Sequence, residues 1–360
     1  MKAAAITPGK RDSLRIVDVP APRPGHWEVA VAPLEAGVCG TDLELNAGFI
    51  GEAPPGSDFL IIGHENLGVV ERLGSGVDCL TRGDLVVATV RRPCPERCYA
   101  CRNGGPDDCL SGDYSERGIR RLHGYMADRY VESPDYLVQV PPELRPVAVL
   151  LEPLSVVEKG IEEIFKIQER LVWQPEKALV AGTGPIGLLA TFVLEGLGVD
   201  TVAFATRERG SLKARVTEAC GARYVDVKEE PLEEIVSRYG PFDISIEATG
   251  VSQIAFDLVR LARTDGVVCL TGLSPRHGET TVCTDCVNMD LVMHNKAVFG
   301  TSSSNRGHFE RGIARLRSIR RQWPGLLERL FTKRVGLDQA AESLCHGKDD
   351  IKVVVEIGAR

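Results

Sequence analysis

The chain has 360 residues, enough for two domains of ordinary size, and its 43% hydrophobic and 26% charged residues are typical of a soluble globular protein. The net charge of −7 argues against a general nucleic-acid-binding protein. No apolar run reaches the ~18 residues that a membrane-spanning helix needs. The first ten residues lack the apolar core of a signal peptide and are predicted to contain a strand. We therefore expect a cytoplasmic protein with neither a nucleic acid nor a membrane as partner.

Two short motifs in the first third of the chain contain zinc-ligand residue types. Cys39 lies in the loop G-V-C-G-T-D and His64 in G-H-E-N-L-G. Taken alone, Cys39 is better explained as a buried structural thiol than as a zinc ligand. His64 and Glu65 are adjacent, so on a strand they would point to opposite faces and only one could reach a given site. A catalytic zinc has three protein ligands, and Glu152, in the apolar stretch L-E-P-L, is a candidate for the third. The alternative for Glu152 is a surface helix cap.

Four of the 11 cysteines are crowded together, which favours a metal site over disulfides in a chain without an export signal. Their spacing is C-x3-C-x2-C-x7-C, and the residues are Cys94, Cys98, Cys101 and Cys109. Four thiolates at short spacing fit a closed tetrahedral zinc site, which leaves no position for a substrate. We expect this zinc to stabilise the polar loop 94–109 and to take no part in chemistry.

The stretch 177–194 predicts a dinucleotide site. Apolar residues 178–181 read as a buried strand, a G-x-G-x-x-G turn follows, and apolar residues continue at helical spacing. The glycines permit a tight turn, close approach of a pyrophosphate and close packing of the helix, whose N-terminus favours phosphate. The predicted cofactor contacts in this turn are Gly182, Thr183, Gly184, Pro185, Ile186 and Gly187. The alternative is a plain strand–turn–helix. An amphipathic helix over 155–171 precedes this stretch.

The end of the second strand, 201–205, indicates which nucleotide is bound. An NAD-binding protein places an acid there, about 20 residues after the glycines, to bind the ribose hydroxyls. Here Thr206 and Arg207 follow the strand, and an arginine suits the 2′-phosphate of NADP. NADP is therefore preferred, while Glu208 keeps NAD possible. The alternative is that these residues are solvated loop charges.

Further strands are predicted at 224–227, 242–247, 266–270 and 297–300, with helices between them. Ligands of such sheets lie beyond the carboxyl ends of the strands, so Thr249 and Leu273 are expected to line the cofactor. Cys283 and Cys286 form a C-x-x-C pair without a second pair or a histidine at ligand spacing, and we interpret them as ordinary thiols.

The last sixty residues are predicted to return to the first domain. A basic amphipathic helix over 308–323 and a short helix over 326–331 are followed by a helix capped by Asp338 and a strand at 351–357. The predicted organisation is a catalytic domain at 1–155, a nucleotide-binding domain at 156–300 and a C-terminal segment at 301–360.

The zinc-ligand and glycine motifs together resemble the zinc-dependent medium-chain dehydrogenase/reductase superfamily. Within it, T-V-R-R-P at 89–93, E-R-G-I at 116–119, H-G-Y-M at 123–126 and E-K at 158–159 resemble the glucose dehydrogenase branch known from archaea. The resemblance covers essentially the whole chain. It implies an α/β fold in which a GroES-like, β-rich catalytic domain is joined to a doubly wound Rossmann domain.

The resemblance also implies roles for individual residues. Cys39, His64 and Glu152 would bind the catalytic zinc, and Glu65 would lie behind them or exchange with a ligand. Further implied residues are Thr41, which relays the alcohol proton; Glu116 and Glu158, near the sugar hydroxyls or the metal; and Ser303, where an asparagine of the branch meets cofactor or sugar. The sequence departs from the superfamily in the three-residue gap between Cys94 and Cys98, where two is usual.

The implied activity is an NADP-linked oxidation of a sugar or polyol hydroxyl, with D-glucose C1 going to the lactone, two zinc ions per chain and a homo-dimer or homo-tetramer. One alternative substrate class is a cyclitol, an aminosugar or a sugar alcohol. An alternative of another class is a redox-inert NADPH-binding interaction protein, but such a protein should have lost Cys39, His64 or Glu152, and all three are present.

Overall fold

The computed structural model describes residues 1–274, 278–345 and 347–358. The chain forms two compact units, and each contains more than one segment of the sequence. The first unit comprises Met1–Ser155, Ser303–Leu316 and Phe331–Arg360, and the second comprises Val156–Ser302 and Arg317–Leu330. No helix in the described ranges is both long and apolar enough to cross a membrane.

A seven-stranded sheet organises the first unit. Its order is β11-β6-β5-β3-β19-β18, and β10 also pairs with β3. The strands are β3 (Val29–Val38), β5 (Glu65–Leu73), β6 (Leu85–Ala88), β10 (Tyr130–Glu132), β11 (Leu137–Gln139), β18 (Phe331–Gly336) and β19 (Lys352–Glu356). The C-terminal strand β19 pairs antiparallel with β3, which brings the end of the chain beside the strand that leads to Cys39.

Two smaller sheets and several short helices complete the first unit. One sheet has the order β2-β1-β4 and the other β7-β8-β9. Their strands are β1 (Lys2–Ile6), β2 (Arg15–Asp18), β4 (Leu60–Ile61), β7 (Arg91–Arg92), β8 (Ser115–Arg117) and β9 (Arg121–Leu122). The helices are α1 (Gly40–Asn46), α2 (Tyr99–Arg102) and α10 (Ala340–Ser343). The 3₁₀ turns are η1 (Pro106–Asp108), η2 (Pro134–Tyr136), η3 (Pro142–Leu150) and η5 (Leu337–Gln339).

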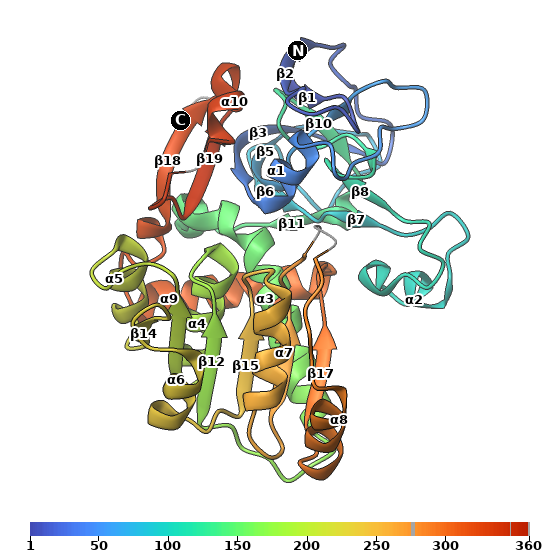
Figure 1. Cartoon of the computed structure of the whole chain (residues 1–360). Coiled ribbons are helices and arrows are strands. Elements are labelled where there is room, and N and C mark those ends of the chain that lie inside the picture. Colours follow the sequence, from blue (N-terminus) through green and yellow to red (C-terminus); the bar gives the residue numbers. More distant parts are fainter. Residues whose placement is uncertain (275–277, 346, 359–360) are drawn as a thin grey trace. The chain divides into compact units, whose positions relative to one another are not determined.

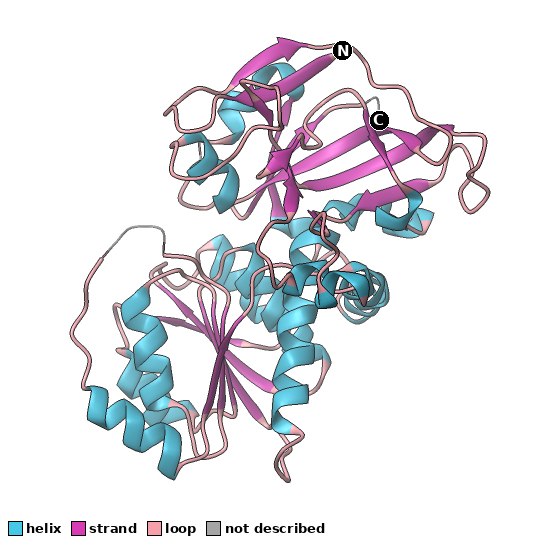
Figure 2. Cartoon of the chain, turned by 90° about the vertical axis from the view of Figure 1, so that its right-hand side faces the viewer, coloured by secondary structure: helices cyan, strands magenta, loops and turns pink. Residues whose placement is uncertain are grey.

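The second unit is built on a parallel sheet with helices on both faces (Figure 2). The strand order is β14-β13-β12-β15-β16-β17, and every pairing is parallel. The strands are β12 (Lys177–Ala181), β13 (Asp200–Ala205), β14 (Arg223–Asp226), β15 (Ile244–Glu247), β16 (Val267–Leu270) and β17 (Ala297–Gly300). Chain order reverses between β12 and β15, and in doubly wound sheets that point is where a nucleotide binds.

The helices of the second unit lie between its strands in the chain (Figure 1). They are α4 (Pro185–Gly196), α5 (Leu212–Glu218), α6 (Leu232–Tyr239), α7 (Ser252–Leu261) and α8 (Thr284–Met293). Two long helices, α3 (Leu151–Gln168) and α9 (Arg306–Gln322), belong partly to each unit. Apolar side chains such as Val202, Phe204 and Phe242 are almost completely buried between sheet and helices. Such continuous apolar strands are expected for a parallel sheet covered on both faces.

The structure corrects four local predictions. The helix expected at 155–171 begins four residues earlier, as α3, so Glu152 lies in its first turn. The helix expected at 326–331 is the 3₁₀ turn η4 (Glu328–Leu330), after which the chain enters β18. Asp338 does not cap a helix, because its carboxylate binds the Lys2 ammonium at 2.8 Å. Cys283 and Cys286 are bonded to each other as a disulfide, so the prediction of ordinary thiols was wrong.

Candidate active site and structural metal site

Cys39 and His64 are brought together by the antiparallel pairing of β3 with β5. Cys39 directly follows β3 and is the N-cap residue of α1, and His64 directly precedes β5. Their closest side-chain atoms, Cys39 Sγ and His64 Nε2, are 3.0 Å apart. Gly63 has φ +90°, and a Cβ there would lie 2.6 Å from Met126 Cγ, so a side chain would disturb the turn that places His64.

Glu65 reaches the same place as its neighbour His64. One ligand atom from each of Cys39, His64 and Glu65 lies within 4.8 Å of the other two. The prediction that only one of the two adjacent residues could point to this site was wrong. The alternation rule holds inside a strand, whereas His64 precedes the first residue of β5 and follows Gly63, whose φ is +90°.

A buried lysine from the last strand holds Glu65. Lys352 Nζ lies 2.6 and 2.7 Å from the two carboxylate oxygens of Glu65 and donates to the Val38 carbonyl at 3.2 Å. The two side chains are 0% and 1% exposed. A Cβ on Gly37 would lie 1.9 Å from a Glu65 oxygen, so a glycine there leaves room for the pair. Sequence reasoning missed Lys352, which is one of two charged residues in the predicted strand 351–357.

Asp42 is a second buried residue that sequence reasoning missed. Its carboxylate accepts a hydrogen bond from the Cys39 backbone N–H at 3.0 Å and lies 3.7 Å from His64 Nδ1. Burial raises the pKa of Asp42. At 3.7 Å the two atoms are not hydrogen-bonded, and both are buried without a hydrogen-bond partner among the described residues. A carboxylate in this position favours the ring orientation in which Nδ1 faces it. Its position three residues after Cys39, at the start of a helix, is the sequence signal that indicates it.

Glu152 adds a further acid to this part of the first unit. It lies in the first turn of α3 and is 9% exposed, unlike an exposed helix cap. Burial, together with the nearby charge of Glu65, raises the pKa of Glu152 to about 7, although His64 opposes the shift. Glu152 is not one of the three residues whose ligand atoms are mutually closest.

The charges of this cluster fit a bound cation. Burial by itself lowers the pKa of His64, but Cys39 and Asp42 raise it well above the usual value. The cluster thus draws a proton onto the ring, and a divalent ion would supply that positive charge in its place. Thiolate, imidazole and carboxylate are the donors that zinc binds, so this donor set fits Zn²⁺.

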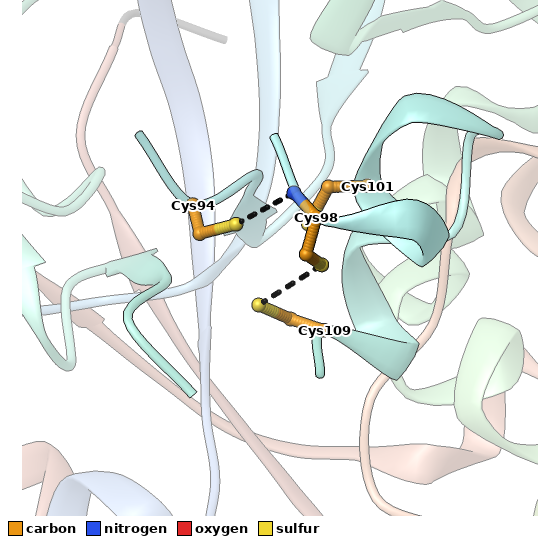
Figure 3. Close-up of side chains that lie close together, drawn as sticks. All are labelled: Cys94, Cys98, Cys101 and Cys109. Carbon is orange, nitrogen blue, oxygen red and sulfur yellow. Dashed lines mark hydrogen bonds between the residues drawn. The ribbon is translucent and has the colours of Figure 1, made fainter. Parts of the chain in front are cut away.

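The four cysteines of the 94–109 loop also converge. Their ligand atoms lie within 4.8 Å of one another, and Figure 3 shows the side chains pointing toward a common centre. Cys98 Sγ is 3.9 Å from Cys109 Sγ, and the Cys98 backbone N–H donates to Cys94 Sγ at 3.3 Å. Backbone N–H groups of Cys101 and Leu110 lower the pKa of Cys98 to about 6. Such hydrogen bonds stabilise thiolates, the form that binds zinc, so this cluster fits a closed Zn²⁺ site.

Replacing Cys98 with serine is expected to lower the zinc content by about one ion per chain and to loosen the loop. The loop 94–109 has little apolar burial of its own, so the metal must supply much of its folding energy. Zinc analysis and limited proteolysis check this, with Cys79→Ser, an exposed free thiol, as the matched control. Unchanged zinc content and protease resistance would rule out the structural zinc.

The glycine turn after β12 has a backbone course that depends on its glycines. Gly182 has φ +99°, and a Cβ on Gly187 would lie 2.0 Å from the Gly182 carbonyl, so only glycine lets α4 approach the strand. A Cβ on Gly184 would meet nothing within 4 Å, so the space before the turn is open. Thr183, Pro185 and Ile186 complete the turn, and Pro185 is the first residue of α4.

A buried glutamate that sequence reasoning missed shapes the next loop of the sheet. Glu247, at the end of β15, is 2% exposed and accepts hydrogen bonds from the backbone N–H groups of Thr249 and Gly250 at 2.6 and 3.0 Å. It therefore fixes the loop that holds Thr249 beyond the carboxyl end of the sheet. Leu273, which follows β16 in the chain, is 65% exposed and is therefore accessible to a ligand.

Arg207 and Arg209 differ in their surroundings. Arg209 lies 3.1 Å from Glu229 and 3.6 Å from Glu230, in ion pairs. Arg207 follows β13 and the exposed Thr206, and within the described residues no ion pair holds its guanidinium. Its backbone carbonyl accepts a hydrogen bond from the Tyr224 hydroxyl, which fixes the chain there. The loop thus presents Arg207 with its charge available to an anionic ligand.

The remaining predicted site residues lie in varied surroundings. Thr41 is half-buried in α1, and Glu116 forms an ion pair with Arg91 at 2.9 Å. Glu158 is buried on the part of α3 that belongs to the second unit. Ser303 is half-buried, while its neighbour Ser304 is hydrogen-bonded to Ser155 at 2.6 Å.

Comparisons with known proteins agree with this architecture. The family model "Glucose dehydrogenase C-terminus" matches residues 145–357, and "Alcohol dehydrogenase GroES-like domain" matches residues 25–142. The chain is 65% identical to a glucose 1-dehydrogenase of Methanocella arvoryzae over 100% of both chains. It is 45% identical to a glucose 1-dehydrogenase of Thermoproteus tenax over 99% of both.

A solved structure is also similar over the whole chain. Haloferax mediterranei glucose dehydrogenase, in complex with NADP, zinc and gluconolactone, is 32% identical, and the match covers 100% of both chains with a TM-score of 0.92. The β-rich unit, the doubly wound unit and the family matches confirm the predicted fold class. The chain therefore belongs to the glucose dehydrogenase branch of the zinc-dependent medium-chain dehydrogenase/reductase superfamily.

Proposed function

We propose that this protein is a zinc-dependent, NADP-linked glucose dehydrogenase that oxidises the C1 hydroxyl of D-glucose to the lactone. The observation that carries the proposal is the cluster of Cys39, His64 and Glu65, with Glu152 nearby, in a chain 65% identical to a glucose 1-dehydrogenase. The first unit would act as the catalytic domain and the second would bind the nucleotide.

The residues of the cluster divide into those that hold the metal and those that hold the ligands. Cys39, His64 and Glu152 would bind the catalytic zinc. Glu65, whose carboxylate is bound by Lys352, would lie behind these ligands. Zinc supplies a Lewis acid that lowers the pKa of an alcohol, and NADP⁺ supplies the hydride acceptor. Thr41, next to Cys39 in the sequence and half-buried, would carry the hydroxyl proton toward solvent.

Recognition of the sugar needs polar groups beyond the metal ligands. Glu116, Glu158 and Ser303 are the residues proposed to contact the remaining hydroxyls. A site built to hydrogen-bond hydroxyls discriminates against analogues that lack them, because its buried polar groups are then left unpaired. Arg91, which pairs with Glu116, would set the orientation of that carboxylate.

The test is NADP⁺ reduction, followed by absorbance, against D-glucose, D-galactose, D-xylose, sorbitol, myo-inositol, aminosugars and simple secondary alcohols. We expect aldoses to be oxidised and D-glucose to be preferred. Activity on a cyclitol or an aminosugar without activity on aldoses would keep the chemistry and reject glucose as substrate. No activity on any alcohol, with NADPH still bound, would support a redox-inert NADPH-binding protein.

Arg207→Ala is expected to lower kcat/KM for NADP⁺ by about 10–100-fold, because hydrogen bonds to a charged group are worth ~1.5–3 kcal/mol. The value for NAD⁺, which lacks the 2′-phosphate, should change little. Arg209→Ala is the matched control, since Arg209 is already engaged by Glu229 and Glu230. Equal losses with both nucleotides would show that Arg207 does not read the 2′-phosphate.

We also propose that the protein is a homo-oligomer, at least a dimer. β17 is one of the two edge strands of its sheet, and Val298 on it is 37% exposed. Met289, Val292 and Met293 on α8, the helix before this strand, are 67–69% exposed. Native proteins rarely leave an apolar sheet edge open, and an exposed apolar patch marks a site of protein–protein contact. Light scattering should show a dimer or tetramer for the wild type and a smaller species for Val298→Lys. A monomeric wild type would reject the proposal.

A further inference from the structure

The disulfide between Cys283 and Cys286 sets these two residues apart from the other cysteines. Nine cysteines are free thiols, and five of those lie in the two candidate zinc sites. Cys220 and Cys269 are buried, and burial raises the pKa of Cys220 to about 11 and the pKa of Cys269 still further. Neither is therefore suited to act as a thiolate in exchange reactions.

The position of the pair favours reversible chemistry. Cys283 is the N-cap residue of α8 and Cys286 lies in its first turn, and both side chains are exposed. The unpaired backbone N–H groups and the positive dipole at a helix start stabilise a thiolate, although Asp285 between the two cysteines works against this. A C-x-x-C sequence at a helix start is an arrangement in which thiolates are reactive.

We propose that Cys283 and Cys286 form a thiol–disulfide exchange site for low-molecular-weight thiols and their disulfides. In the oxidising direction, one cysteine thiolate attacks a small-molecule disulfide and releases one thiol. The second cysteine then attacks the mixed disulfide, forms the Cys283–Cys286 bond and releases the second thiol. The protein loses two electrons and two protons, and the small disulfide gains them as two thiols. Reduction runs the same two steps in reverse.

The exposed single cysteines cannot carry out this reaction. Cys79 and Cys345 are exposed, but each lacks a bonded cysteine partner among the described residues, so a mixed disulfide formed there has no internal thiol to resolve it. The cysteines of the zinc sites would be withheld by the metal. Exchange should therefore be confined to one pair while both zinc ions remain bound.

The bond also constrains the chain before α8. Residues 278–280 line a pocket together with residues 250–253 at the start of α7, and the Thr280 hydroxyl contacts the Gln253 side chain. Cys283 ends this segment, so its link to Cys286 fixes the segment to the first turn of the helix. Reduction should therefore increase amide hydrogen exchange over 278–286 and leave β12 and α4 unchanged.

The experiment equilibrates the zinc-loaded full chain in a series of reduced and oxidised glutathione mixtures. After acid quench and maleimide labelling, peptide mass spectrometry measures the oxidised fraction of each cysteine, and zinc is measured in parallel. We expect Cys283 and Cys286 to change together, reversibly, with zinc content constant. Cys283→Ser and Cys286→Ser should instead form a mixed disulfide with glutathione at the remaining cysteine. Cys79→Ser, the matched control, should leave the transition unchanged.

Three results would overturn the proposal. In the first, the pair stays reduced in the most oxidising mixture. In the second, the pair stays oxidised in the most reducing mixture. Either result would mean that no exchange occurs. In the third, the pair is oxidised only as zinc is lost, which would mean that the zinc-site thiols are the reactive groups. The readout is the labelling state and not dehydrogenase activity, so it does not depend on the identity of the substrate.

Discussion

Replacing Cys39 with serine is expected to lower kcat/KM for D-glucose by about 10³-fold or more. Loss of the thiolate removes a ligand from the cluster in which Cys39 Sγ and His64 Nε2 are 3.0 Å apart. A Lewis-acid metal contributes several kcal/mol to the transition state, and each 1.36 kcal/mol is tenfold in rate, so its loss is worth about three powers of ten. Steady-state kinetics with NADP⁺ provide the measurement.

Two further measurements separate this effect from general damage. NADPH fluorescence titration should give an unchanged dissociation constant, because the glycine turn belongs to the other unit. Zinc content should fall by about one ion per chain. The control Cys79→Ser removes an exposed thiol outside both clusters and should retain full activity. Survival of activity in Cys39→Ser would show that the zinc-assisted mechanism is wrong.

Lys352→Met is expected to lower the free energy of unfolding by about 3–5 kcal/mol, because it leaves the buried Glu65 carboxylate without its partner. That loss is a large fraction of the ~5–15 kcal/mol that stabilises a typical native protein. Denaturant unfolding of the zinc-loaded protein measures it. Burial lowers the pKa of Lys352, but Glu65 and Cys39 raise it above the ordinary value, so the lysine is charged at neutral pH.

The matched control is Lys166→Met on α3. Lys166 also pairs with a glutamate, Glu162, at 2.5 Å, but its side chain is 64% exposed, so we expect a change of about 0–1 kcal/mol. Adding Glu65→Gln to Lys352→Met should restore part of the stability, because the unpaired charge is then gone. Equal small effects of Lys352→Met and Lys166→Met would show that the buried pair is not what holds Glu65.

Features that depend on nearby residues were predictable from the sequence. The spacing of Gly182, Gly184 and Gly187 predicts a strand–turn–helix, and the structure has it at β12 and α4. The four-cysteine spacing predicts one cluster, and the structure brings the four sulfurs together. The alternation of apolar strands and helices predicts the parallel sheet. The turn and the cysteine loop follow from residue types only a few positions apart, and the sheet follows from a strand–helix pattern that repeats along the chain.

Only the tertiary structure shows how the candidate active site is assembled. Lys352 and Glu65 are 287 residues apart, and they meet because β19 pairs with β3, which in turn pairs with β5. The position of Asp42 beside His64 depends on how the start of α1 lies against His64. The placement of His64 and Glu65 at one site depends on the backbone conformation at Gly63. Local spacing fixes a short loop, whereas contacts between distant strands depend on the register of a whole sheet, which no short motif encodes.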